Sequence, residues 1–443
     1  MKPSTNIKGI SQPNRCRNAA RERVCIGEVV VCAAQSSQSI QPYKEIFVKQ
    51  TKQRLLKPAL ARFAFAASIA LGSVALVTPA WSQTYPAEEL FVVGTDSQVY
   101  AQKLDANGNP LGRYFLVQAG QVKALATVDT TRSGVGPLGV AEIFVIGTDN
   151  QVYFKRFDFN GDPVTSYTPL PGQVKAIAAV ASVTGSGSFT SVTIQLFVIG
   201  TDSQVYVHQF DGNGNPLGNY ILISGLVSAI AVGHAQSGSP PLLFALRSDN
   251  QVYMHQFDIY ANPVGGYTLV GCPASGVAPC PIKAITAQTG NPVLLATGTD
   301  QQVWVQRFDA NANRVGGYEV VGTPGVLNQV KAVSVSSMNP FCAGCWPLYN
   351  LADRPLLFVI GTDNQVYEHL FDSGGNPLGS YVQIPNGVNA VYAHHELFVI
   401  GTDQQVWMHK LDQFANPVGS YINIPNQVKT IGGEVFLPLS PIQ

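Results

Sequence analysis

Residues 356–381 read LLFVIGTDNQVYEHLFDSGGNPLGSY, and close variants of this phrase recur along the chain. An apolar run leads into Gly-Thr-Asp, an alternating run follows, and an Asn-Pro turn precedes a final tyrosine. The phrase occurs seven times, each copy anchored by one aspartate: Asp96, Asp149, Asp202, Asp249, Asp300, Asp363 and Asp403. Short β-type runs that recur at intervals of 40 to 63 residues predict a radially repeated β-architecture.

Each copy contains four short runs that are typical of β-strands, bounded by Gly, Asn, Asp and Pro. In the second copy these runs are residues 142–148, 151–158, 166–170 and 173–180. The small side chains of the last run suit the crowded axis of a propeller, and the tyrosine-containing run suits its periphery. We therefore expect an all-β, seven-bladed propeller of four-stranded antiparallel blades. Its C-terminal strand would close the ring by completing the blade that begins at Leu90.

The repeats begin near Glu89, after a leader of different composition. Residues 49–62 are basic, residues 63–77 are apolar, and small residues precede the Ser82–Gln83 bond. This pattern predicts a signal peptide over residues 49–82, cleaved near that bond, and a secreted or periplasmic protein. An uncleaved anchor is the alternative, although the apolar run is shorter than the ~20 residues of a membrane span.

The leader divides the chain into three predicted regions. Residues 1–48 fit no part of a signal peptide, and we interpret them as a mis-annotated or disordered extension. The propeller would then occupy residues 83–443. The whole chain has 27 basic and 27 acidic residues, but 12 basic and 3 acidic ones precede position 83, so the remainder carries a net charge of −9. Such an acidic domain has no general electrostatic reason to bind nucleic acid or an anionic membrane.

Four cysteines follow the leader, in the segments CPASGVAPC (residues 272–280) and CAGC (residues 342–345). In an oxidising compartment the simplest interpretation is two local disulfides, Cys272–Cys280 and Cys342–Cys345. A redox or zinc role for the CxxC motif is the alternative. We expect no stable membrane insertion after signal cleavage, and the oligomeric state is open.

The Asp-x-Asn-Gly-Asn-Pro element, residues 105–110 in the first copy, has two interpretations. Its oxygen-bearing side chains are spaced like the start of a calcium loop. However, the middle position becomes Tyr260, Gly374 or Phe414 elsewhere, and Asn-Gly is typical of a hairpin turn. We expect a turn and assign no metal ligand and no cofactor. The seven anchoring aspartates are likewise expected to cap their own turns, with an anion site near the lysines that open most inner strands as the alternative.

One position of every third run is aromatic, and a histidine follows two residues later in four copies. An aromatic ring beside a hydrogen-bonding group suits a sugar, because the ring stacks on C–H patches while the polar group takes a hydroxyl. Packing between blades is the alternative role. The candidate ligand-binding residues are Tyr100, Tyr153, Tyr206, His208, Tyr253, His255, Trp304, Tyr367, His369, Trp407 and His409.

The repeat resembles that of tectonin-type and bacterial fucose-binding seven-bladed propeller lectins. The resemblance rests on an apolar strand followed by Gly-Thr-Asp-x-x-Val-Tyr, which residues 197–206 show as FVIGTDSQVY, and it covers residues 88–436. It implies binding of sugars such as fucose or O-methylated glycans in clefts between blades. The outer strand of that family commonly carries Trp-x-x-Trp, whereas this chain has Gly-x-Tyr, so no sugar-contacting residue is carried over.

The sequence contains no G-x-S-x-G, HExxH or P-loop motif. We therefore assign no catalytic residue and expect a protein without enzymatic activity. The predicted function is that of an exported, lectin-like propeller with several equivalent weak glycan sites between blades. A protein-interaction or cell-surface scaffold is the alternative, with a surface protein as its partner.

Overall fold

The computed structural model of the chain describes residues 88–105, 108–118, 120–129, 141–158, 161–184, 191–235, 239–258, 260, 262–273, 282–287, 293–322, 330–338, 354–385, 387–393, 396–412 and 416–436. The chain divides into two compact units, Met1–Leu76 and Val77–Gln443, and every described residue belongs to the second. The predicted extension and signal peptide lie outside the described residues. Across these ranges no helix has the length and apolar character that crossing a membrane requires.

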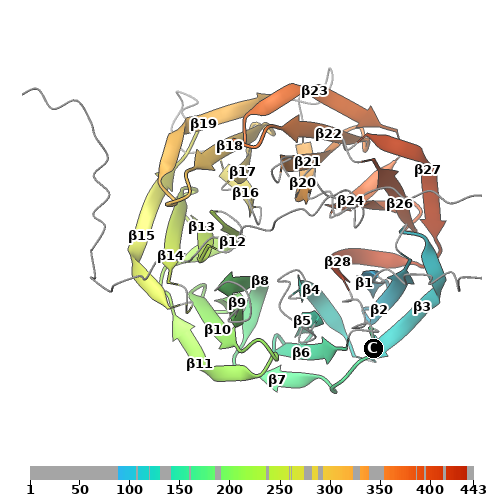
Figure 1. Ribbon diagram of the computed structural model, residues 1–443, viewed down its shortest axis with the longest axis horizontal. Coiled ribbons are helices and arrows are strands. Elements are labelled where there is room, and N and C mark those ends of the chain that lie inside the picture. Colours follow the sequence, from blue (N-terminus) through green and yellow to red (C-terminus); the bar gives the residue numbers. More distant parts are fainter. Residues whose placement is uncertain are drawn as a thin grey trace, which may run out of the picture. The chain divides into compact units, whose positions relative to one another are not determined.

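Seven four-stranded antiparallel sheets surround a central axis as the blades of a propeller (Figure 1). We number the blades by their order in the chain. Their strands are β28 (Val428–Phe436), β1 (Glu88–Gly94), β2 (Val99–Leu104) and β3 (Pro110–Gln118) in blade 1; β4 (Val122–Asp129), β5 (Ala141–Gly147), β6 (Val152–Phe157) and β7 (Thr168–Leu170) in blade 2; β8 (Val174–Thr184), β9 (Ser191–Gly200), β10 (Val205–Phe210) and β11 (Pro216–Leu222) in blade 3; β12 (Val227–His234), β13 (Pro241–Arg247), β14 (Val252–Phe257) and β15 (Pro263–Gly271) in blade 4; β16 (Ile282–Ala287), β17 (Val293–Gly298), β18 (Val303–Phe308) and β19 (Arg314–Gly322) in blade 5; β20 (Val330–Met338), β21 (Arg354–Gly361), β22 (Val366–Phe371) and β23 (Pro377–Ile384) in blade 6; and β24 (Val388–Ala393), β25 (Leu397–Gly401), β26 (Val406–Leu411) and β27 (Pro417–Ile424) in blade 7.

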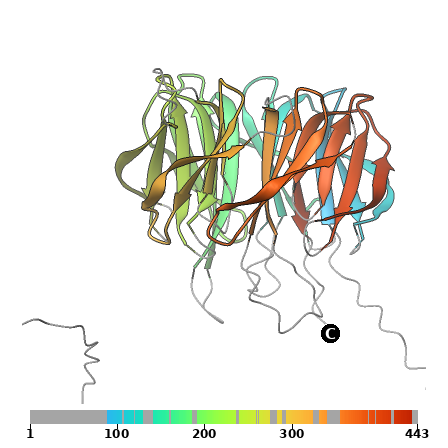
Figure 2. The same cartoon turned by 90° about the horizontal axis from the view of Figure 1, so that it is seen from above.

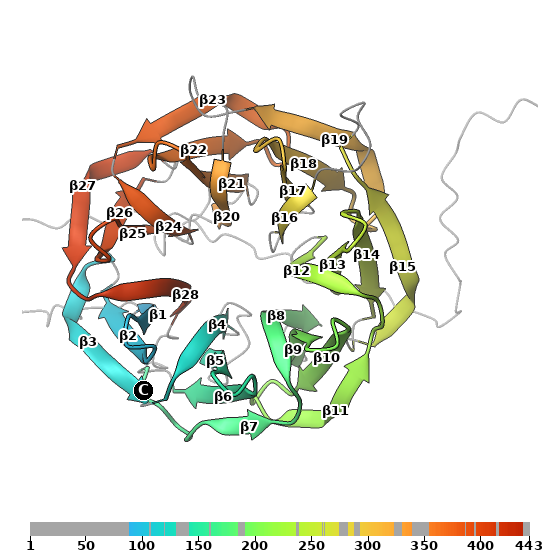
Figure 3. The same ribbon diagram turned by 180° about the vertical axis from the view of Figure 1, so that it is seen from behind.

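The order of strands within each blade agrees with the sequence-based expectation. From the axis outward, blade 2 runs β4, β5, β6 and β7, and the other blades repeat this order (Figure 3). The innermost strands crowd together at the axis, where small side chains are needed. A methyl group on Gly432 of β28 would overlap the side chain of Leu125 in the neighbouring strand β4. Small residues therefore let the blades converge.

The ring closes in blade 1, where the C-terminal strand β28 pairs with the first strand β1. The pairing is antiparallel and runs from Glu88 opposite Phe436 to Gly94 opposite Val428, with two register shifts. This confirms the predicted closure. β1 thus pairs with β28 on its inner side and with β2 on its outer side, so it is not left as an open edge strand.

Strands run up and down between two rims of the propeller (Figure 2). One rim carries the turns between the second and third strands of each blade, with the seven aspartates, and we call it the Asp rim. The other carries the Asp-x-Asn-Gly-Asn turns between the third and outer strands, and we call it the Asn rim. Backbone bonds join neighbouring blades at the Asp rim: Val122 of β4 donates to the carbonyl of Ser97 in blade 1 at 2.7 Å, and Val428 donates to Gln404 at 2.8 Å.

The core lies between the blades, where the apolar faces of adjacent sheets meet. At the interface of blades 1 and 2, Phe91 packs on Phe157 with ring centroids 5.0 Å apart. In blade 2 the face with Val145, Tyr153 and Tyr167 is the one turned toward blade 1. The third-strand aromatic and the outer-strand tyrosine of this blade therefore lie in a cleft shared with the preceding blade. The same placement recurs in blade 3 for Tyr206 and Tyr220, which pack toward blade 2.

Candidate functional site

The turns of the Asp rim are three-residue hairpin loops held by their own aspartates. In the first copy, Ser97 donates its N–H to the Gly94 carbonyl at 2.9 Å and has a φ of 65°, the conformation of a type I turn followed by a left-handed residue. The Asp96 carboxylate accepts the N–H of Gln98 at 3.0 Å. The same bond, at 3.0–3.1 Å, forms at Asp149, Asp202, Asp249, Asp300, Asp363 and Asp403. The predicted capping role of these aspartates is confirmed.

Six of the seven aspartates also bind the aromatic residue four positions later, which the sequence analysis did not anticipate; the exception is blade 5, where the Trp304 indole N–H has no partner among the described residues. The hydroxyl of Tyr153 donates to the second carboxylate oxygen of Asp149 at 2.6 Å. The equivalent bonds of the other four tyrosines measure 2.5–3.0 Å: Tyr100–Asp96, Tyr206–Asp202, Tyr253–Asp249 and Tyr367–Asp363. In blade 7 the indole N–H of Trp407 donates to Asp403 at 3.4 Å. The constant four-residue spacing from Asp to aromatic was the available signal.

The glycine that precedes each Thr-Asp makes this contact possible. A Cβ on Gly361 would lie 2.5 Å from the Asp363 carboxylate and 3.0 Å from the Tyr367 ring, closer than real contacts allow. The bond lowers the pKa of Asp149, and it raises the pKa of Tyr153 because ionising the phenol would break it. The aromatic hydroxyl of the predicted sugar site is therefore already engaged by its own turn.

The four histidines of the candidate set lie inside the blade interfaces. His208, His255, His369 and His409 are buried. His208 Nδ1 lies 3.1 Å from the Gln209 carbonyl, and its ring meets the outer-strand Tyr220 edge-on at 4.8 Å. Burial lowers the pKa of His208, so the ring is neutral at neutral pH. The structure thus brings each histidine to an outer-strand tyrosine, while the binding role of the set stays a prediction.

In three blades the histidine position carries another polar residue with an equally internal role. Gln102 donates to the Leu111 carbonyl at 3.1 Å, and Gln306 donates to the Arg307 carbonyl at 2.9 Å. Lys155 of blade 2 instead crosses the interface and donates to the Val117 carbonyl of blade 1 at 2.8 Å. Its ammonium also lies 5.3 Å from the centre of the Tyr167 ring. This position therefore ties the outer strand, or the neighbouring blade, to the third strand.

A cavity of about 360 Å³ opens at the Asp rim on the face that blade 2 turns toward blade 1. Small-molecule sites typically enclose ~300–1,000 Å³. Tyr153 is the candidate residue that lines it, and Tyr167 of the outer strand lines it as well. The remaining wall consists of Gly120, Gln121, Val122, Val145, Gly147, Thr148 and Asp149. Aromatic rings, a carboxylate and an amide thus converge at one opening.

The outer strand beside this cavity departs from the repeat. Other copies bend this strand at a glycine of positive φ, such as Gly112 (73°) or Gly218 (67°). Blade 2 has Thr165 at that position, and its outer strand β7 is reduced to Thr168–Leu170. The Thr165 hydroxyl instead accepts the N–H of Arg156 at 3.3 Å. The shortened strand coincides with the blade at which the cavity opens.

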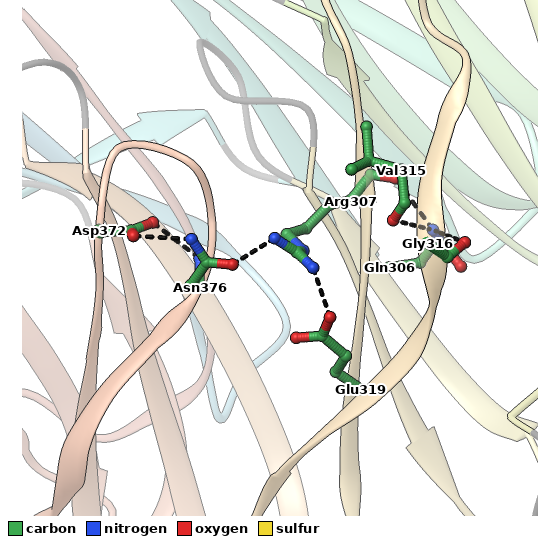
Figure 4. A network of polar contacts seen from close by, with 7 residues as sticks. All are labelled: Gln306, Arg307, Val315, Gly316, Glu319, Asp372 and Asn376. Atoms are coloured by element: carbon green, nitrogen blue, oxygen red, sulfur yellow. Dashed lines mark hydrogen bonds and ion pairs between the residues drawn. The ribbon is translucent and has the colours of Figure 1, made fainter.

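On the Asn rim, charged side chains of one blade hold the turn of the next. Arg156 of blade 2 donates to the Asn213 carbonyl at 2.5 Å and to Asn215 Oδ1 at 3.3 Å in blade 3. Lys410 of blade 7 donates to Asn109 Oδ1 of blade 1 at 2.7 Å. In Figure 4, Arg307 of blade 5 lies between Glu319 of its own blade and Asn376 in the turn of blade 6. We call these side chains the blade clamps.

The elements that receive the clamps are turns, as predicted, and their own aspartates close them. Asp105 accepts the N–H of Asn109 at 2.7 Å, and Gly108 at φ 70° completes a three-residue loop. Within the described ranges, no group of three or more His, Cys, Asp or Glu side chains is arranged to hold a metal ion. Cys272 forms no disulfide with a described residue. Cys280, Cys342 and Cys345 lie outside the described residues, so both bridges stay predictions.

The fold resembles those of two solved proteins. A lectin from Burkholderia pseudomallei, BP39L, matches with a TM-score of 0.56 and 16% identity, covering 77% of this chain and 99% of the lectin. The periplasmic gluconolactonase PpgL of Pseudomonas aeruginosa matches with a TM-score of 0.53 and 12% identity, covering 80% of this chain and all of that one. No protein-family model and no curated protein matches the sequence.

These matches correct one expectation from the sequence. The lack of hydrolase and nucleotide-binding motifs led us to expect a protein without enzymatic activity. The gluconolactonase is an enzyme built on the same fold at similar coverage, so neither the propeller nor the missing motifs exclude catalysis. At identities of 12–16% both matches concern the fold. The chain thus resembles propeller lectins, including BP39L, in architecture.

Proposed function

We propose that the protein is an exported, carbohydrate-binding propeller, and that its main site is the cavity at Tyr153 and Tyr167 on the face that blade 2 turns toward blade 1. The observation that carries the proposal is the lining of that cavity. Two tyrosine rings offer faces for the C–H patches of a sugar, while the Asp149 carboxylate, the Gln121 amide and the Thr148 hydroxyl offer hydrogen bonds. Small ligands typically bind in such largely apolar concavities with a few convergent polar groups.

Repetition supports a multivalent mode of binding. The turn, its aspartate and its aromatic residue recur around the ring, and the proposal is that weaker sugar sites recur with them. Several weak sites on one rigid ring raise avidity on a dense glycan surface without a strong single contact. The architecture shared with a lectin is consistent with this role.

Binding to a glycan array, followed by competition with millimolar monosaccharides, tests the proposal. Tyr153→Ala removes a wall of the cavity, and we expect it to weaken glycan binding. Tyr100→Ala makes the same change at the equivalent position of blade 1 and serves as the matched control. A lectin with its main site in this cavity loses more binding from the first change than from the second. Flat binding of the unaltered protein across all glycans would reject the proposal.

A protein-interaction scaffold is the second candidate, favoured by one feature of the outer strands. These strands carry exposed apolar side chains in repeated positions around the perimeter: Leu111, Leu116, Leu217, Leu222, Val264, Leu269, Val315, Val320, Leu378, Val382 and Val418. Repeated exposed apolar side chains of this kind would suit contact with a protein partner. Flat glycan binding together with saturable binding to a purified surface protein would favour this candidate.

A further inference from the structure

The Asp rim departs from the repeat most strongly at blade 4. Six copies have glycine before the Thr-Asp pair, whereas blade 4 has Arg247 followed by Ser248. The preceding connection changes too, since Gln121 and Lys123 of blade 2 correspond to Leu226 and Ser228 in blade 4. The variations gather around one cleft, between blades 3 and 4.

Arg247 points into the part of this cleft that is open in blade 2. Its guanidinium carbon lies 4.0 Å from the centre of the Tyr253 ring and 4.7 Å from the centre of the Tyr267 ring. Its Nη2 lies 3.2 Å from where a Cβ on Gly225 would stand. Gly225, Tyr253 and Tyr267 correspond to the cavity-lining Gly120, Tyr153 and Tyr167. The Arg247 side chain thus occupies the position that corresponds to the open cavity of blade 2.

The half-buried Arg247 contacts both aromatic rings through its guanidinium. Their centroids are 6.5 Å apart and their planes meet at 84°, so Arg247 sits in the corner between them. Cation–π contacts of this kind fix an arginine without neutralising it. Arg247 makes no ion pair with any described carboxylate. Its Nε–H and the Tyr267 hydroxyl are both buried without a hydrogen-bond partner in the described part of the chain.

The turn of blade 4 also differs from the other turns in the length of its Asp–Tyr hydrogen bond. The Tyr253–Asp249 bond measures 3.0 Å, compared with 2.5–2.7 Å in the other four tyrosine copies. The longest of the five Asp–Tyr bonds thus occurs in the copy that has a side chain in place of glycine.

We propose that the cleft between blades 3 and 4 is a subsite for a negatively charged sugar, whose carboxylate or sulfate is bound by Arg247. The planar fork of arginine matches both anions in bidentate geometry, and the sugar would lie on the solvent side of Arg247, because the guanidinium itself occupies the corner between the Tyr253 and Tyr267 rings. This inference rests on the proposed function and deepens it, because it assigns a ligand class to one of the clefts.

Isothermal titration with three probes tests the subsite: methyl β-D-glucuronide, glucose 6-sulfate and the neutral methyl β-D-glucoside. We expect one or both anionic sugars to bind more tightly than the glucoside, and their binding to weaken with added salt. Arg247→Gly restores the residue of the other six copies. It should weaken anionic binding by about tenfold or more, because a charge-assisted hydrogen bond is lost.

Arg113→Gly, which removes the same charge from an exposed position on the outer strand β3, is the matched control and should leave anionic binding unchanged. Equal binding of anionic sugars by Arg247→Gly and by the unaltered protein would overturn the subsite, as would failure of both anionic sugars to bind the unaltered protein. If Arg247→Gly gains binding of methyl β-D-glucoside and neither protein binds an anionic sugar, then Arg247 only fills the cleft. That result would also overturn the subsite. Anionic binding that survives Tyr153→Ala but not Arg247→Gly would uphold this subsite even if the blade 2 cavity failed its own test.

Discussion

The Arg156 guanidinium of blade 2 donates a 2.5 Å hydrogen bond to the backbone carbonyl of Asn213 in the turn of blade 3. A carbonyl receives this bond, so it depends on the path of the chain in the turn more than on a particular side chain. Lys410 and Arg307 reach the corresponding turns of blades 1 and 6 from the same strand position. Blade 6 has Leu370 there, so the clamps reinforce some interfaces and not others.

Removing a blade clamp should destabilise the ring without changing a blade. Arg156→Met keeps much of the side-chain volume and loses both bonds to blade 3, and we expect the free energy of unfolding to fall by about 1 kcal/mol. Urea denaturation followed by tryptophan fluorescence measures this loss. Arg113→Met, an exposed substitution on β3, is the control and should fall within ~0.5 kcal/mol of the unaltered protein. Indistinguishable midpoints for the two variants would contradict the clamp role.

The turn glycines should tolerate no side chain without cost. In Gly361→Ala the new methyl group would press on Asp363 and Tyr367, and we expect a loss of roughly 1–3 kcal/mol, as overpacked sites usually show. Gly266→Ala is the control, because a Cβ there meets nothing within 4 Å. Chemical denaturation of both variants gives the comparison. The explanation fails if the two alanines have the same effect.

Stability should fall as the pH rises from neutral to mildly alkaline. Burial raises the pKa of Glu142 to about 8, and the same cause raises those of Glu89 and Glu368 to about 8. In the unfolded chain these carboxyls titrate near 4.5. Between pH ~4.5 and ~8 the folded protein therefore holds protons that the unfolded chain has released, and each increase in pH favours unfolding. Below that window the contribution is fully present.

Glu142→Gln isolates one of these carboxyls. Glutamine copies the shape of the neutral acid and does not titrate, so the drop in unfolding free energy between pH 7 and pH 8 should be smaller in the variant. The difference between the two proteins cancels the contribution of the buried histidines. Guanidinium titrations at the two pH values measure it. Parallel drops would show that Glu142 is ionised in the fold, with Arg156 as its nearby cation.

The C-terminal strand should be indispensable. A chain that ends after Gln427 lacks β28, which leaves β1 unpaired on its inner side, and we expect it to lose cooperative unfolding and to aggregate. A chain that ends after Phe436 retains the whole strand and is the matched control. Circular dichroism and size-exclusion chromatography distinguish the outcomes. A folded monomer without β28 would refute the closure as a requirement for folding.

The propeller could be predicted because its information is local and repeated. The aspartate spacing, the small residues of β8 and the Asn-Gly turns each constrain a single strand or loop, and seven copies reduce the ambiguity of one. The blade clamps could not be predicted in this way, because they join residues far apart, such as Arg156 with Asn215 or Lys410 with Asn109. The spacing of the repeats along the sequence does not determine which turn a long side chain reaches.

The candidate site was only partly visible for a similar reason. The alternation of the third strand places Tyr153 and Lys155 on one face, but it does not say that the tyrosine hydroxyl returns to Asp149 or that the lysine crosses to Val117. The sequence shows Arg247 in place of glycine, but it does not show that the guanidinium contacts the Tyr253 and Tyr267 rings, because only folding brings these three residues together.

Because β1 pairs with β28, the first blade cannot be completed before the C-terminal strand is available. As a nascent or translocating polypeptide emerges, six sheets can assemble in turn from neighbouring sequence, whereas the first must remain a three-stranded fragment until almost the whole chain has appeared. During that interval its bare edge is a template for intermolecular pairing. A chaperone that shields newly delivered strands would have its greatest effect on this blade.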